Sequence, residues 1–217
     1  MVPAAELGGL RMTKAVGDIF YGAYVADYEE KRSRSDVWEK ENASLVTLLD
    51  LVNGASRVLD VPFGSGRFLE EYLRRGFSVT GVDISGDMFE QAKRLRGGLL
   101  DRCETFVGSA DNLPYDDDSF DLVVSYRFLS GIVDSGTALA SMREFHRVAP
   151  KAILQLKCRN PKLEPIDLPK PNEKLGVAYY RKDMDTLFAG VGYRIDAEVQ
   201  IDDDPKGIRW AFLVSRL

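Results

Sequence analysis

One short stretch of the sequence, Asp60-Val61-Pro62-Phe63-Gly64-Ser65-Gly66, combines glycines with a carboxylate. Glycines at the mouth of a helix let a ligand approach the backbone closely, and the helix N-terminus offers free N–H groups. The stretch departs from the dinucleotide fingerprint G-x-G-x-x-G, because Leu69 occupies the third glycine position. The Asp60 carboxylate would repel a pyrophosphate, whereas it would suit a ligand with an ammonium or sulfonium charge.

Two further pieces follow the next two predicted strands. Asp83 ends the strand in GVDIS, 17 residues after Gly66, which is close to the spacing of a ribose-binding acid. A carboxylate accepts two hydrogen bonds and therefore matches a vicinal diol, but it disfavours a phosphorylated ribose. The segment 108–115, GSADNLPY, offers backbone donors and the Asp111 carboxylate, which could bind the edge of an adenine.

Each piece also has an ordinary structural interpretation. A glycine turn after a strand is often only a turn, and an Asp at a strand end is more often a helix cap or turn former. The specific signal is the order of the three pieces at three consecutive strand ends.

The elements that must position these residues alternate between strands and helices. The predicted strands span residues 57–61, 77–83, 104–108, 120–126, 151–157, 193–200 and 209–215, and the predicted helices span 44–52, 64–75, 86–95, 137–148 and 181–189. This alternation predicts an α/β fold with a doubly wound, mostly parallel sheet, in which ligands bind at the carboxyl ends of the strands. The last two strands are expected to form a hairpin, and the proline-rich segment 158–180 a long loop.

Composition bounds the remaining possibilities. The chain has 217 residues and a mass of 24.2 kDa, which suits a single domain 1–217 with an N-terminal helical cap (1–52) and a core (53–217). Two cysteines and one histidine, His146, argue against a disulfide framework and a metal site, and His146 is expected to be structural. The net charge of −5 argues against nucleic acid as a partner. The absence of a long apolar run and of a signal-peptide core predicts a cytoplasmic protein that acts without a membrane.

The runs VLDVPFGSGRFLEEYLRRGFSVTGVDIS, SADNLPYDDDSFDLVV and ALASMREFHRVAPKAILQL resemble the class I S-adenosylmethionine-dependent methyltransferases of the small-molecule type. The resemblance covers about residues 40–217 and is best from 57 to 157. It implies a Rossmann-like sheet of seven strands with an antiparallel last strand. It also implies S-adenosyl-L-methionine as cofactor, S-adenosyl-L-homocysteine as product and a small-molecule substrate.

The resemblance assigns a role to individual residues on the cofactor side. Asp60 and the two glycines would hold the methionine part, Asp83 would bind the ribose hydroxyls, and the Ala110 N–H would bind the adenine ring. The expected cofactor-binding residues are Asp60, Pro62, Gly64, Gly66, Asp83, Ile84, Met88, Ser109, Ala110, Asp111 and Tyr126.

The sequence also departs from the family pattern. Pro62 replaces the usual first glycine, and Ser109 stands where an Asp is common, so the adenine amine contact is expected to shift to Asp111. Ser130-Gly131 replaces a frequent histidine, and Ala149-Pro150-Lys151 replaces a Gly-Gly turn.

Methyl transfer from a sulfonium is an in-line displacement that mainly requires alignment and exclusion of water. Tyr21, Tyr24 and Tyr28 share one face of a predicted helix, so Tyr21 and Tyr28 are catalytic candidates that would close over the sulfonium; core packing is the alternative. Arg127 is the third candidate, since its guanidinium could grip a carboxylate. No general base is evident, which leaves a neutral amine, an ionised oxygen or a carboxylate base such as Asp134.

Four functions stay open at this level. The leading prediction is methyl transfer to a nitrogen or oxygen of a small molecule. The alternatives are consumption of the cofactor without an acceptor, by cyclisation or elimination, and a non-catalytic module that binds the cofactor. Methylation of RNA or protein is disfavoured because a basic face and an Asn/Asp-Pro-Pro-Tyr motif are absent. Both a monomer and a homodimer fit the sequence.

Overall fold

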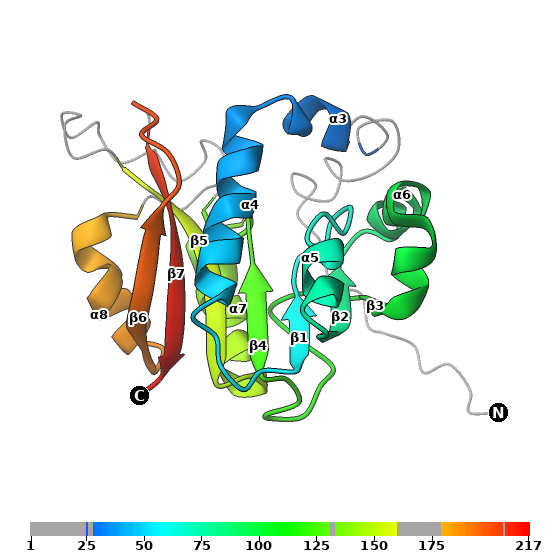
Figure 1. Cartoon of the computed structure of the whole chain (residues 1–217). Coiled ribbons are helices and arrows are strands. Elements are labelled where there is room, and N and C mark those ends of the chain that lie inside the picture. The colour runs from blue at the N-terminus through cyan, green and yellow to red at the C-terminus, as the bar shows by residue number, and fades with distance from the viewer. Residues whose placement is uncertain (1–24, 26–27, 131–132, 160–178, 206) are drawn as a thin grey trace.

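The computed structural model describes residues 25, 28–130, 133–159, 179–205 and 207–217, with the backbone alone at 28, 31 and 32. Strands and helices alternate along this part of the chain (Figure 1). The strands are β1 (Arg57–Asp60), β2 (Ser78–Asp83), β3 (Glu104–Val107), β4 (Leu122–Ser125), β5 (Lys151–Cys158), β6 (Tyr193–Gln200) and β7 (Ile208–Arg216). The α-helices are α3 (Tyr28–Ser33), α4 (Asp36–Leu49), α5 (Leu69–Arg74), α6 (Gly86–Arg96), α7 (Ser135–Val148) and α8 (Met184–Ala189), and 3₁₀ helices span Gly97–Arg102 and Arg181–Asp183.

The described strands form one seven-stranded sheet in the order β3-β2-β1-β4-β5-β7-β6. The strands from β3 to β5 are parallel, whereas β7 runs antiparallel to both β5 and β6, which confirms the predicted sheet and its terminal hairpin. The strand order reverses between β1 and β4. Because Asp60 pairs with Gly81 on one side and with Val124 on the other, the carboxyl ends of three strands lie level at this switch point.

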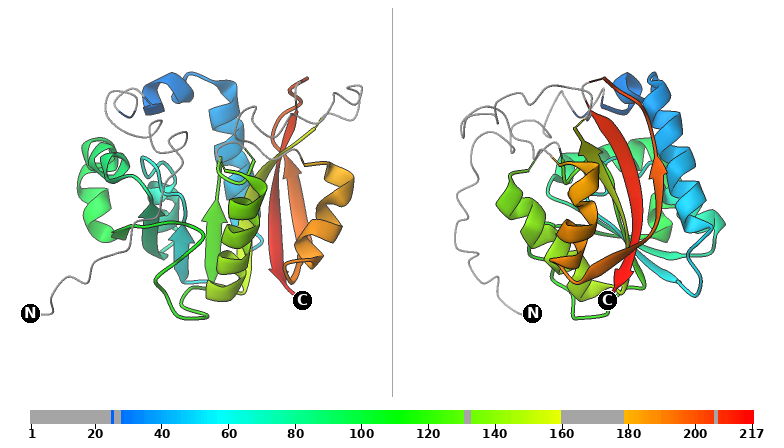
Figure 2. Two further views of the ribbon diagram at one scale, coloured as in Figure 1. Left: turned by 180° about the vertical axis from the view of Figure 1, so that it is seen from behind. Right: turned by 90° about the vertical axis from the view of Figure 1, so that its left-hand side faces the viewer.

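Helices cover both faces of the sheet (Figure 2). Successive residues of a strand point to opposite faces, and the core divides accordingly. Leu122 and Val124 of β4 pack in the core that includes α4 and α5, while Val123 packs in the core that includes α7 and α8. The central strands β1, β2, β4 and β5 are therefore buried on both sides, which explains their apolar runs, whereas the edge strands β3 and β6 carry exposed residues.

Two helices begin five or more residues away from their predicted starts. The predicted helix 64–75 begins only at Leu69, because Gly64 (φ +56°) and Gly66 (φ +68°) adopt left-handed backbone conformations that end helical geometry in the turn. The predicted helix 44–52 is the second half of α4, which begins at Asp36 behind the N-cap Ser35 and ends at Leu49. Its first turns carry the exposed polar residues Asp36, Glu39 and Lys40, so they lack the apolar period that marks a helix. The division into cap and core at residue 52 stays a prediction.

Candidate functional site

A cavity of about 230 Å³ opens at the switch point, where the carboxyl ends of β1, β2 and β4 meet. Its walls come from the segments after β1 to β4, from the start of α7 and from Trp38 of α4. The structure brings most of the predicted residues together here, namely Asp60, Pro62, Gly64, Asp83, Ile84, Met88, Ser109, Ala110, Tyr126 and Arg127. The predicted residues Gly66 and Asp111 do not line the cavity.

The glycine turn is held against β2 by backbone and ring contacts. Phe63 donates its N–H to Val82 O at 2.8 Å, and the Gly66 N–H returns to Phe63 O at 3.0 Å. The Phe63 ring lies over Gly81, where an added Cβ would meet Phe63 Cδ2 at 2.4 Å. A glycine in the neighbouring strand is therefore required for the turn to pack, although Gly81 itself does not line the cavity.

Asp83 joins the glycine turn to the end of β2. One carboxylate oxygen accepts the Gly64 N–H at 2.8 Å, and the other accepts the Ser85 N–H at 2.9 Å. Burial raises the pKa of Asp83 to about 6, and these hydrogen bonds oppose the shift. Since each carboxylate oxygen has two lone pairs, Asp83 can still accept hydrogen bonds from a ligand.

Asp60 is the second buried acid of the cavity, with 3% of its surface exposed. Burial raises its pKa well above the usual range, while the nearby Arg67 charge favours the ionised form. A buried acid of this kind is costly to ionise without a cation. The ionised form would therefore gain most from a positively charged ligand group.

The segment after β3 lines the same cavity as Ile84 and Met88. The Gly108 N–H binds Asp83 O at 2.9 Å, which places Ser109 and Ala110 at the cavity. The Ser109 hydroxyl donates a short hydrogen bond to Asp111. The expected contact of Asp111 with an adenine amine stays a prediction.

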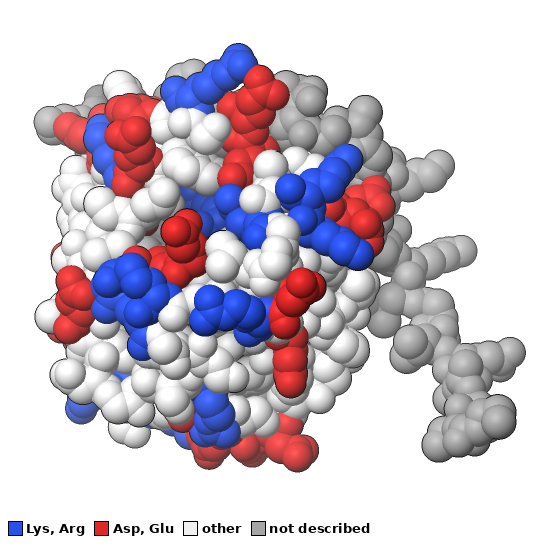
Figure 3. Space-filling view, turned by 45° about the vertical axis from the view of Figure 1, so that its right-hand side comes forward, with Lys and Arg blue, Asp and Glu red and all other residues white. Residues whose placement is uncertain are grey.

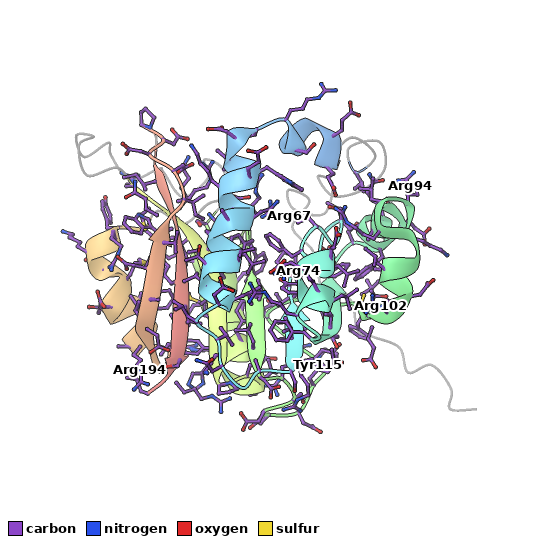
Figure 4. All side chains as sticks on the ribbon, in the orientation of Figure 1. Arg67, Arg74, Arg94, Arg102, Tyr115 and Arg194 are labelled. Atoms are coloured by element: carbon purple, nitrogen blue, oxygen red, sulfur yellow. The ribbon has the colours of Figure 1, made fainter. Side chains whose placement is uncertain are left out.

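A cluster of one carboxylate and two guanidinium groups, Glu41, Arg67 and Arg127, closes the cavity on the α4 side. Glu41 is completely buried and accepts hydrogen bonds from Arg67 Nη1 at 2.8 Å and from Arg127 Nε at 2.9 and 2.7 Å. The Trp38 ring centre lies 4.4 Å from Arg67 Cζ and 5.9 Å from Arg127 Cζ. Figure 4 shows Arg67 beside α4.

Trp38, Glu41 and Arg67 belong to the site but were not predicted from the sequence. The available signal was the position of Glu41 on the apolar face of α4, one turn before Leu45 and two before Leu48. A charge on such a face requires a buried partner.

Tyr126 ties the end of β4 to α4. Its hydroxyl lies 3.0 Å from the Ser44 hydroxyl oxygen, and its ring packs edge-on against Phe68 with centres 5.0 Å apart. Burial raises the pKa of Tyr126, so the phenol is protonated at neutral pH.

The catalytic candidates have different outcomes. Tyr21 and Tyr24 lie outside the described residues, and Tyr28 begins α3 without a described side chain. Arg127 lines the cavity with φ +56°, and its N–H binds Gln155 Oε1 at 2.7 Å. Its contribution to catalysis stays a prediction.

Asp134 and His146 are two titratable side chains that bear on the role of general base. Asp134 caps α7 and accepts hydrogen bonds from Gly136 and Thr137, which lower its pKa and make it a weaker base. His146 does not line the cavity and packs edge-on against Tyr193, as expected for a structural residue.

The described residues include no cluster of three or more potential metal ligands. In the same part of the chain, no helix is long and apolar enough to cross a membrane. On the face drawn in Figure 3, basic and acidic side chains are interspersed. This mixture contrasts with the continuous basic surface typical of a nucleic-acid interface.

Residues 58–151 match the family model described as a methyltransferase domain. A demethylmenaquinone methyltransferase from Staphylococcus epidermidis is 34% identical over 115 residues, which cover 52% of this chain and 44% of that protein. The matched part thus spans less than half of the relative's length.

Solved structures extend the similarity in fold. The PH0226 protein from Pyrococcus horikoshii OT3 superimposes with a TM-score of 0.65 and 22% identity, covering 95% of this chain and 97% of that one. The [4+2]-cyclase SpnF superimposes with a TM-score of 0.62 and 15% identity, covering 76% and 77%. At these identities the comparison establishes the fold alone.

Proposed function

From the premise that the chain belongs to the class I S-adenosylmethionine-dependent methyltransferases, we propose that it methylates a small molecule with S-adenosyl-L-methionine as donor. The acceptor atom is a nitrogen or an oxygen. The observation that carries the proposal is the cavity at the switch point, lined by the glycine turn and by the buried acids Asp60 and Asp83.

The chemistry of the cavity fits this cofactor. Asp60 is buried, and its charge is favoured by a cation, which the ammonium and sulfonium of the methionine part would supply. Asp83 would accept hydrogen bonds from the ribose hydroxyls. Ile84, Met88 and the Ala110 backbone would bind the adenine, since all three line the cavity.

The bound cofactor would supply an activated methyl group, and the protein would align it with the acceptor and exclude water. Among the described residues, Asp134 is engaged as a helix cap with a lowered pKa. A nucleophile that needs little help in losing a proton, such as a neutral amine or an ionised oxygen, therefore fits the cavity best. A relative named for demethylmenaquinone supports a small organic acceptor.

A second function is consumption of the cofactor without a separate acceptor. The [4+2]-cyclase SpnF has the same fold, so the fold by itself is compatible with chemistry other than methyl transfer. A non-catalytic cofactor-binding module is the third. For each of them we propose action in the cytoplasm, as a monomer or homodimer, without nucleic acid or membrane.

The test is a calorimetric titration with S-adenosyl-L-methionine, followed by mass spectrometry of the mixture after overnight incubation without acceptor. Binding with the donor intact supports a methyltransferase that awaits its substrate. Consumption of the donor supports the second function. Asp83→Ala should weaken binding by about 2 kcal/mol, the typical cost of losing a charged hydrogen-bond partner. If the wild-type protein does not bind the donor, the proposal is wrong.

A further inference from the structure

One guanidinium of the cluster has an unmet hydrogen bond. Arg67 exposes only 10% of its side chain and uses Nη1 to bind Glu41. Its Nη2 is buried and has no hydrogen-bond partner among the described residues. A buried charged donor without an acceptor is costly, and in native proteins such groups are rare.

The surroundings of Arg67 hold its guanidinium in place. The rings of Trp38 and Phe68 have their centres 4.4 and 4.2 Å from Arg67 Cζ, and Glu41 fixes Nη1. Arg67, Trp38 and Phe68 all line the cavity at the switch point. Because these contacts restrict its motion, the guanidinium is already positioned at the wall of the cavity that a ligand would enter.

The charge of the cluster indicates which ligand group this donor suits. Arg67 and Arg127 share one buried carboxylate, Glu41, so the cluster itself has two positive charges and one negative charge. An anionic oxygen would satisfy Nη2. A guanidinium with a free edge is well suited to a carboxylate.

We propose that Arg67 is a ligand-binding residue that donates Nη2–H to a carboxylate bound in the cavity, with Glu41 and Trp38 as positioning residues. The carboxylate has two possible sources, the amino-acid end of the cofactor or an anionic acceptor. The inference rests on the proposed function in that the ligand occupies the same cavity.

The experiment compares wild type, Arg67→Gln and Arg67→Lys by calorimetry. One arm titrates S-adenosyl-L-homocysteine and its decarboxylated analogue, which differ only in the carboxylate. The other arm titrates benzoate, acetate and phenyl phosphate into the S-adenosyl-L-homocysteine complex and into the unliganded protein. Arg75→Gln is the matched control, since Arg75 binds Glu71 and Asp50 outside the cavity. Thermal melts identify any variant that fails to fold. If Arg67→Gln fails to fold, Arg67→Lys, which retains the positive charge, takes its place in the comparison.

If the carboxylate belongs to the cofactor, Arg67→Gln should weaken S-adenosyl-L-homocysteine about 10- to 100-fold and leave the decarboxylated analogue nearly unchanged. If it belongs to the acceptor, both nucleosides should bind all variants equally, and an anionic probe should bind wild type but not Arg67→Gln. Arg67→Lys should recover part of the lost affinity in either case.

Equal behaviour of wild type and Arg67→Gln in both arms would overturn the role of Arg67. A wild-type protein that binds no S-adenosyl-L-homocysteine would instead refute the proposed function. The anionic probes on the unliganded protein would then still decide the role of Arg67.

Discussion

Asp83 should destabilise the unliganded protein at neutral pH, and Asp83→Asn measures this effect. Burial raises its pKa from 3.8 to about 6, a difference of roughly 2 units or about 3 kcal/mol. Between these two values the folded state binds more protons than the unfolded state, so stability falls as pH rises. The cost of the ionised carboxylate is small near pH 4 and complete above about pH 7.

The variant carries no charge at this position, so its stability lacks this dependence on pH. The unfolding free energy of Asp83→Asn minus that of wild type should therefore increase by about 2 kcal/mol from pH 4.5 to pH 7.5. The amide loses one of the hydrogen bonds from Gly64 or Ser85, but that loss is the same at both pH values. Only the change with pH reports the buried charge.

Urea unfolding of both proteins at the two pH values supplies the numbers. Asp121→Asn is the control, because Asp121 has a lowered pKa: hydrogen bonds from Arg57 and Ser56 outweigh its partial burial. Its stabilising contribution is lost only as pH falls below about 4, so its difference from wild type should stay flat from pH 4.5 to 7.5. A flat or falling difference for Asp83→Asn would refute the burial argument.

Two further substitutions test the packing of the site. Gly81→Ala should destabilise the protein by about 1–3 kcal/mol and weaken S-adenosyl-L-homocysteine, because the new methyl would displace the Phe63 ring and the glycine turn. Gly98→Ala is its control, because an added Cβ there meets nothing within 4 Å. Melting and binding curves of Gly81→Ala that equal those of Gly98→Ala would contradict the prediction. Glu41→Gln should cost about 3–5 kcal/mol of unfolding free energy, because it leaves two guanidinium groups without their buried counter-charge. If urea unfolding shows a loss of unfolding free energy below about 1 kcal/mol, Glu41 does not stabilise the two guanidinium groups as proposed.

Local chemistry made much of the fold predictable. The strands from Arg57 to Asp60 and from Tyr193 to Gln200 were recognisable because each is a short apolar or alternating run between turn residues. Asp60, Gly64 and Asp83 were recognisable as site residues because parallel strands bring their carboxyl ends to one edge of the sheet.

Other features depend on contacts between segments far apart in the chain. Gly81 is required only because Phe63 packs on it. Glu41 and Arg127 are 86 positions apart, so no local pattern links them.

The sequence by itself thus determined the order of strands and helices and the edge of the cavity formed by the glycine turn and the strand ends, because periodicity and turn chemistry act over a few residues. Only the tertiary structure decided how the other wall is built. The pairing of Glu41 with Arg67 and Arg127, the buried Nη2 of Arg67 and the raised pKa of Asp83 all arise from burial among residues distant in sequence. Burial sets the energy of a charge, and burial is a property of the folded chain.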